Sequence, residues 1–154
     1  MSVDISWHKE GQRDEDLLHY IADAASKMLS HLALNESELS IVLAADSFIQ
    51  DLNRTWRDLD EATDVLSFPL EDGDMDPQVN HLGDIVISLD TAAVQAKSHG
   101  FNLQDEVLFL LIHGLCHLCG HDHGDENEAS KMRSAEAVLL GLVATHLQRP
   151  ADYY

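Results

Sequence analysis

Three histidines in the C-terminal half carry the clearest chemical pattern of this chain: His113, His117 and His123. His113 and His117 are four residues apart, so on a helix their side chains lie one turn apart on the same face. Gly120 can end that helix in a left-handed turn, which would bring His123 back toward the first two. Three imidazoles around one ion leave a fourth position open, and this is typical of a catalytic zinc site rather than a structural one.

The spacing of these residues is the metzincin protease spacing, with one difference. The protease motif requires a glutamate directly after the first histidine, where it acts as general base. This chain has Gly114 at that position. The sequence therefore predicts a metal site without the peptidase base and indicates a hydrolase of another class. A zinc peptidase stays as an alternative that would need a base from elsewhere in the chain.

The segment around the first two histidines predicts a buried helix over residues 106–119. Its apolar residues surround the helix on almost every side: Val107, Leu108, Phe109, Leu110, Leu111, Ile112, Leu115 and Leu118. A buried polar group without a partner is costly. Two histidines on one face of such a helix therefore favour a bound metal.

Two cysteines in the same segment offer a second interpretation, because a pair separated by two residues followed by histidines can belong to a zinc finger. At about 100° per residue, Cys119 points away from the histidine face and Cys116 lies to its side. A second cysteine pair is lacking. We therefore expect both to be small core residues. His121 breaks the ligand spacing, and we expect it behind the ligands or exposed.

The composition predicts one domain over residues 1–154, with residues 151–154 as a frayed tail. Hydrophobic residues make up 45% and charged residues 24% of the chain, which is ordinary for a soluble globular protein. No segment has the length of a membrane span, and the first residues match neither a signal nor a transit peptide. We expect a cytoplasmic protein without a membrane partner. The two cysteines fit a reducing compartment.

The charge balance is strongly acidic, with 9 basic and 28 acidic residues and a net charge of −19. Such a surface repels polyanions over long range, so charge alone disfavours nucleic acid as a partner. Residues 71–77 are predicted to form an acidic flexible loop. Asp125, Glu126 and Glu128 are placed at the start of a helix, where the helix dipole favours them. We expect the acidity to serve solubility or adaptation to salt.

Hydrophobic periodicity predicts four strands, at residues 3–7, 39–44, 64–69 and 83–88. Helices are expected at residues 15–32, 46–56 with Asp46 as cap, 91–98, 106–119 and 125–146. The last helix has a predicted apolar face of Met132, Ala135, Val138, Leu139, Leu142 and Val143. We therefore predict an α+β fold with a central sheet of about four strands, about five helices and the metzincin-like three-histidine helix packed on the sheet. Pro69 indicates a strand that ends there or lies at an edge.

Two arginines precede the third predicted strand. Arg54 is expected on a solvated helix face. Arg57 lies at the end of the helix, just before the turn, where it could point into a cleft. The planar fork of an arginine suits phosphate.

Three segments together resemble the YbeY family of metal-dependent endoribonucleases. The first is the histidine-containing segment at residues 113–123. The second combines Asn53 and Arg57, four residues apart, with residues 63–69, and the third is residues 82–87. The resemblance extends from about residue 53 to residue 123. It implies cleavage of single-stranded RNA in ribosomal RNA maturation, especially at the small-subunit 3′ end, and in ribosome quality control. It also implies that His113, His117 and His123 are the metal ligands and that Arg57 is the functional arginine.

We expect these ligands to hold one Zn²⁺ per chain, with another divalent metal as the alternative. The ion would lower the pKa of a bound water from ~16 toward ~7, and Arg57 would stabilise charge on the phosphate. Attack by water and attack by the ribose 2′-OH both remain open, and no general base is assigned. A second hypothesis is a metal-bound ribosome-assembly factor that acts mainly by binding, since an acidic surface suits basic small-subunit proteins.

Overall fold

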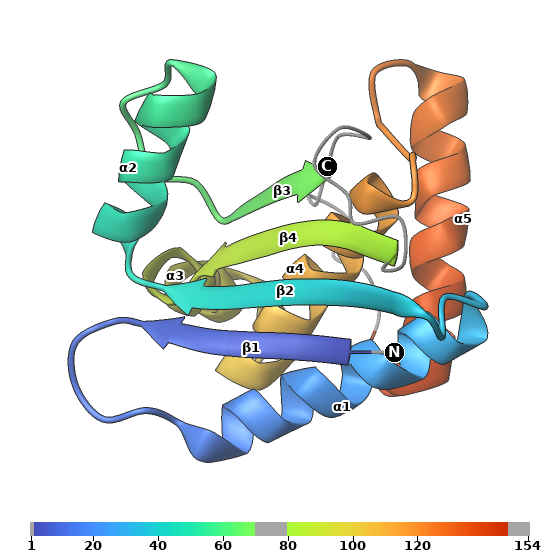
Figure 1. Ribbon diagram of the computed structural model, residues 1–154, viewed down its shortest axis with the longest axis horizontal. Helices are drawn as coiled ribbons and strands as arrows, with labels where there is room; N and C mark the ends of the chain where they lie inside the picture. Colours follow the sequence, from blue (N-terminus) through green and yellow to red (C-terminus); the bar gives the residue numbers. More distant parts are fainter. Residues whose placement is uncertain (1, 70–79, 148–154) are drawn as a thin grey trace.

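The computed structural model describes residues 2–69 and 80–147 (Figure 1). The predicted acidic loop at 71–77 and the predicted tail at 151–154 lie outside these residues. Four strands form one sheet in the order β1-β2-β4-β3. The strands are β1 (Ser2–His8), β2 (Ser37–Ala44), β3 (Val65–Pro69) and β4 (Asn80–Ser88). The first, second and fourth run parallel, and β3 pairs antiparallel with β4 at the edge.

Five helices complete the described part of the chain: α1 (Glu15–His31), α2 (Asp46–Arg57), α3 (Leu89–His99), α4 (Leu103–Leu118) and α5 (Glu126–Val143). The predicted α+β fold with a four-stranded sheet and five helices is therefore confirmed. None of the described helices is long and apolar enough to cross a membrane.

Alternating residues of the strands separate the core into two parts. Leu39, Ile41 and Leu43 of β2 belong to the main core, in which α1 and α4 pack against the sheet. The alternate residues Val42 and Ala44 of the same strand point to the opposite face, where they belong to a smaller cluster with Phe48 and other residues of α2. This is the two-residue period of a strand whose two faces both meet apolar partners.

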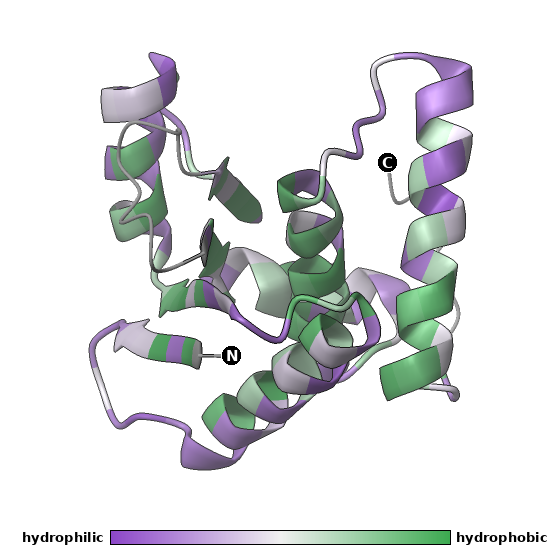
Figure 2. Ribbon diagram, turned by 45° about the vertical axis from the view of Figure 1, so that its right-hand side comes forward, coloured by the Kyte–Doolittle hydropathy of each residue, from purple (hydrophilic) through white to green (hydrophobic). Residues whose placement is uncertain are grey.

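The apolar helix α4 lies in the middle of the molecule. It packs against β3 and β4, and α1 and α5 pack against it in turn. Figure 2 shows α4 as a hydrophobic segment surrounded by helices with mixed faces. Because α4 is enclosed in this way, its backbone gives a rigid position to any side chain near its C-terminal end.

Side-chain caps define where most of these helices begin. Asp14, Ser88, Asn102 and Asp125 each accept a hydrogen bond from the backbone N–H three residues further on, as helix N-caps do. The predicted capping role of Asp46 is wrong, because Ala45 occupies the cap position of α2 and makes no side-chain bond. Asp46 lies in the first turn and accepts hydrogen bonds from the hydroxyls of Ser88 and Thr91, which tie α2 to the start of α3.

The predicted apolar face of α5 is only partly correct. Met132 and Leu139 are buried, but Val138 is 54% and Leu142 is 42% exposed. The reason is that α5 packs mainly on α1 and α4 and not on the sheet, so only a narrow strip of the helix is covered. That strip also contains Glu136, which is 1% exposed.

Candidate metal centre

The C-terminal end of α4 places two of the three histidines. His113 is buried and His117 is half-buried, one turn further along the helix. The helix ends at Leu118, and Gly120 adopts the predicted left-handed conformation with φ of 96°. Its N–H donates to the carbonyl oxygen of His117 at 3.0 Å, and the N–H of His121 donates to that of Cys116 at 3.0 Å. This pair of bonds is the Schellman motif, which turns the chain sharply after a helix.

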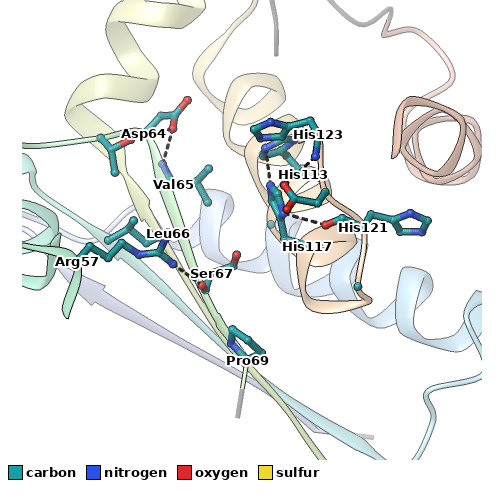
Figure 3. A pocket seen from close by; sticks show the side chains of 14 residues that line it. Arg57, Asp64, Val65, Leu66, Ser67, Pro69, His113, His117, His121 and His123 are labelled. Atoms are coloured by element: carbon teal, nitrogen blue, oxygen red, sulfur yellow. Dashed lines mark hydrogen bonds between the residues drawn. The ribbon is translucent and has the colours of Figure 1, made fainter. Parts of the chain in front are cut away.

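The turn brings His123 back to the two helical histidines, as the sequence predicts. One ligand atom from each of the three residues lies within 4.8 Å of the others. Nε2 of His113 and Nε2 of His117 are 3.2 Å apart, and the ring of His123 stacks on that of His113 with centroids 5.8 Å apart. Figure 3 shows the three rings gathered on one side of a cleft. Among the described residues, they are the one cluster of potential ligands that meets this distance.

Partners of the outer ring nitrogens orient two of the imidazoles. Nδ1 of His117 lies 3.0 Å from the backbone carbonyl oxygen of His121. A hydrogen on Nδ1 donates to that oxygen and leaves Nε2 with its lone pair toward His113. The side chain of His121 is half-buried and points away from the three rings (Figure 3). Its contribution is therefore its carbonyl group, which the sequence pattern does not reveal.

Nδ1 of the other helical ligand candidate, His113, lies 3.5 Å from Oε2 of Glu136 on α5. Sequence reasoning missed this glutamate. The available signal was a charged residue within the otherwise apolar strip of α5, between Met132 and Leu139. A carboxylate behind a histidine ring is a common arrangement in metal sites.

The environment lowers the pKa of His117 below its ordinary value of 6.5. Burial is the main cause, and the neighbouring His113 and His123 add to it by charge repulsion. The hydrogen bond to the carbonyl of His121 acts in the opposite direction. Because metals bind the neutral imidazole, a lowered pKa keeps this side chain in its ligand form.

The donor set fits a zinc ion. Three imidazole nitrogens and one open position are the donor set of a catalytic zinc site. The two cysteines do not join the described cluster, so the structure does not support a zinc finger. Cys116 is buried as predicted, but Cys119 is exposed. The prediction for Cys119 was wrong because the residue follows the end of α4, where the chain turns toward the surface.

Gly114 occupies the position of the missing peptidase base, and the fold explains the glycine. A Cβ atom at this position would lie 2.9 Å from Cγ2 of Ile85 on β4. Real Cβ atoms essentially never come this close to another heavy atom, so the side chain of Ile85 or the helix itself would have to shift. The close packing of α4 on Ile85 of β4 therefore favours a glycine beside the first histidine.

A cleft of about 520 Å³ opens in front of the three histidines. Its second wall is formed by Arg57 and residues 63–67 of β3 and the loop before it, opposite α4 (Figure 3). Arg57 is the last residue of α2 and lines the cleft, as the sequence suggests. Its Nη2 donates to the carbonyl oxygen of Ser67 at 3.0 Å, and its guanidinium lies 5.3 Å from the centre of the Phe68 ring.

Among the described residues that line it, the cleft contains one permanently charged cation, Arg57, beside the two carboxylates of Asp64 and Asp122. Oδ1 of Asp64 accepts the N–H of Val65 at 2.7 Å. Arg54, one turn earlier on α2, instead pairs with Asp51 at 2.8 Å on the surface, as expected for a solvated helix face. Arg57 therefore differs from Arg54 by facing the histidines.

The family model described as endoribonuclease YbeY matches residues 4–143. The chain belongs to the YbeY endoribonuclease family. It is 49% identical over 131 residues to the endoribonuclease YbeY of Carboxydothermus hydrogenoformans, covering 82% of this chain and 86% of that protein. It is 45% identical over 121 residues to the endoribonuclease YbeY of Thermus thermophilus, covering 77% of this chain and 86% of that protein.

The fold of this YbeY family member is also similar to the solution structure of TM1509 from Thermotoga maritima. The TM-score is 0.59 at 21% identity, over 98% of this chain and 99% of that one; at this identity the likeness supports the fold alone. Membership of the YbeY family confirms the resemblance inferred from the three sequence segments. It favours a nuclease over the zinc peptidase and over the assembly factor that acts mainly by binding.

Proposed function

We propose that this YbeY family member is a zinc-dependent endoribonuclease that cleaves single-stranded ribosomal RNA. Its process would be small-subunit 3′-end maturation and ribosome quality control in the cytoplasm. The observation that carries the proposal is the cleft itself, with the three histidines on one wall and Arg57 on the other. Family membership supports the nuclease activity. The sequence resemblance supports the ribosomal substrate.

His113, His117 and His123 would hold one zinc ion per chain. When bound, the ion supplies a Lewis acid that lowers the pKa of a water and polarises a phosphoryl oxygen. Burial within the protein keeps His117 in the neutral form that can bind the ion. The protein also contributes ring orientation through the carbonyl group of His121.

Arg57 would bind the scissile phosphate and stabilise the negative charge that builds on its oxygens. The bond to Ser67 and the ring of Phe68 hold the guanidinium in place before substrate arrives. A guanidinium has five N–H donors, so donors remain for a phosphate after the bond to Ser67. Preorganised donors of this kind need no rearrangement during the reaction.

Because the net charge of the chain is −19, Arg57 and the bound ion would have a second role, which is to attract RNA to the cleft. An acidic surface repels RNA at long range, whereas Arg57 and a divalent ion attract phosphate at short range. Productive binding should therefore depend on the cleft rather than on the general surface. This supports recognition of a strand that can enter the cleft one phosphate at a time.

The test is an RNA cleavage assay with the zinc-loaded protein. Single-stranded RNA with the small-subunit 3′-end sequence should be cut, while the matched duplex and casein should not. A chelator should abolish cleavage, and zinc should restore it. Arg57→Ala should lower kcat/KM by about 100- to 1,000-fold, as the loss of one charge-stabilising donor does. Arg54→Ala is the matched control on the same helix and should cleave like the wild type.

Other results would contradict the proposal in distinct ways. Full activity of Arg57→Ala would overturn the role of the arginine. Casein cleavage would favour a peptidase, and an inert protein that sediments with small ribosomal subunits would favour an assembly factor. The product ends also report on the nucleophile, because a 2′,3′-cyclic phosphate implicates the ribose 2′-OH.

A further inference from the structure

Glu136 is a buried carboxylate that faces one of the three histidines. It lies on α5 and is 1% exposed, and its Oε2 is 3.5 Å from Nδ1 of His113, which is itself 2% exposed. Both atoms are shielded from solvent, and the 3.5 Å between them is an ion-pair contact rather than a formed hydrogen bond. A carboxylate this far from water is tolerated only where an opposite charge or a hydrogen-bond donor compensates for its lost hydration. The position of Glu136 therefore calls for a role beyond helix packing.

The opposite nitrogen of the same ring suggests that role. Nε2 of His113 faces Nε2 of His117 at 3.2 Å, on the side where the candidate ligands converge. A neutral imidazole carries one hydrogen, and the nitrogen without hydrogen is the one that binds a metal. An ion bound through Nε2 of His113 thus requires the hydrogen on Nδ1, the atom that faces Glu136.

His117 has the same arrangement with a different acceptor, since its Nδ1 lies 3.0 Å from the carbonyl oxygen of His121. Acceptors behind ligating histidines fix the tautomer and the ring orientation, and they raise the basicity of the ligating nitrogen. A carboxylate does more than a carbonyl group because it also carries a negative charge. In a buried site that charge offsets part of the charge of a divalent ion.

We propose that Glu136 is a positioning residue of the metal centre. Its carboxylate lies against Nδ1 of His113, favours the hydrogen on that nitrogen, keeps Nε2 toward the ion, and supplies one buried negative charge. Glu136 is not among the described residues that line the cleft, so it acts through His113 and not on the substrate. This inference rests on the proposed function, because it presupposes the metal site.

Glu106 provides a matched comparison within the same protein. It is fully buried on α4, and its Oε1 lies 2.7 Å from Nδ1 of His99. It precedes His113 by seven residues, so it lies about 10 Å away along the helix. His99 does not belong to the three-histidine cluster. Glu106→Gln therefore changes a buried glutamate–histidine pair and leaves the metal ligands untouched.

The experiment measures zinc affinity and cobalt spectra rather than RNA cleavage. Zinc dissociation constants are determined by chelator competition for the wild type, Glu136→Gln, Glu136→Leu and Glu106→Gln. Glu136→Leu should weaken zinc binding by about 10- to 100-fold, the usual cost of losing an outer partner of a ligand. Glu136→Gln should lose less, because its amide oxygen can still lie against Nδ1 of His113. The visible Co²⁺ spectrum should change in Glu136→Leu and stay as in the wild type in Glu106→Gln.

Equal zinc affinity in the wild type and both Glu136 variants would overturn the inference. An equal loss in Glu106→Gln would also overturn it, because the effect would then be general destabilisation. If Glu136→Leu does not fold, the comparison of Glu136→Gln with Glu106→Gln decides. A wild type that binds no zinc would overturn both this inference and the proposed metal site. Zinc binding by the wild type together with equal affinity in the Glu136 variants would overturn this inference alone.

Discussion

Nε2 of His113 lies 3.2 Å from Nε2 of His117, across one turn of a buried helix. Two rings this close repel each other when both are protonated to the positively charged imidazolium form. Burial and this repulsion together lower the pKa of His117. The side chain of His117 is therefore held in the neutral state that binds a metal, and the cost of protonating it has consequences for stability.

The first prediction concerns the pH dependence of folding in the metal-free protein. Because the pKa of His117 is lower in the folded than in the unfolded chain, the unfolded state binds more protons below the unfolded value of 6.5. The stabilisation is present above that value and is lost as the pH falls through the folded pKa. Urea unfolding from about pH 7.5 to about pH 5 should show this loss.

Two variants isolate the contribution of His117. His117→Asn should reduce the slope of unfolding free energy against pH in that range. His19→Asn removes an exposed histidine on α1 and should keep the wild-type slope. Equal slopes in His117→Asn and the wild type would show that His117 is not the group responsible.

The second prediction concerns metal binding and stability. A ligand that binds only the folded state raises its stability, by about 2.7 kcal/mol at 100 times the dissociation constant. Zinc should therefore raise Tm in thermal unfolding, and a chelator should reverse the shift. His123 is exposed, so His123→Ala should leave the metal-free Tm almost unchanged while removing most of the zinc-induced rise. A full rise in His123→Ala would exclude this residue as a ligand.

The third prediction concerns the contact between Gly114 and Ile85. Gly114→Ala places a Cβ atom 2.9 Å from Cγ2 of Ile85, and overpacking of this kind costs about 1–3 kcal/mol. Gly141→Ala is the matched control, because a Cβ at this exposed helical position meets nothing within 4 Å. It should be neutral or stabilising by up to about 1 kcal/mol. Denaturant unfolding measures both, and similar effects at the two sites would contradict the packing argument.

The fourth prediction concerns the cysteines. Burial raises the pKa of the Cys116 thiol to about 12, with further contributions from the negative charge of Glu136 and from Cys119. Cys119 is exposed as a residue, but neighbouring atoms still remove part of the water around its thiol, which raises its pKa as well. Since the thiolate is the reactive and metal-binding form, both thiols should react slowly with iodoacetamide near neutral pH. Cys119→Ser and Cys116→Ala should each bind as much zinc as the wild type, and reduced zinc content would revive the zinc-finger interpretation.

The spacing of the histidines is the part of the site that follows most directly from sequence. Residues four apart on a helix share a face, and Gly120 allows the left-handed turn that returns the chain to His123. The apolar composition of α4 likewise predicts its burial. These features depend on local backbone geometry, which neighbouring residues in the chain largely determine.

Predictions from the sequence fail where the burial of a residue, or its role as a helix cap, depends on other segments of the chain. Val138 and Leu142 have the spacing of a core face, yet both are exposed because α5 packs mainly on two helices and not on the sheet. Cys119 is exposed because α4 ends one residue earlier, at the buried Leu118. Asp46 binds side chains at the start of α3 instead of capping its own helix.

The sequence by itself determined the three potential ligands, the turn that gathers them and the absence of a base at Gly114. Only the tertiary structure decided which groups face them. It placed Arg57 across the cleft and Glu136 behind His113. The physical reason is that helical spacing is a local property, whereas these contacts depend on how segments that are distant in sequence pack around α4.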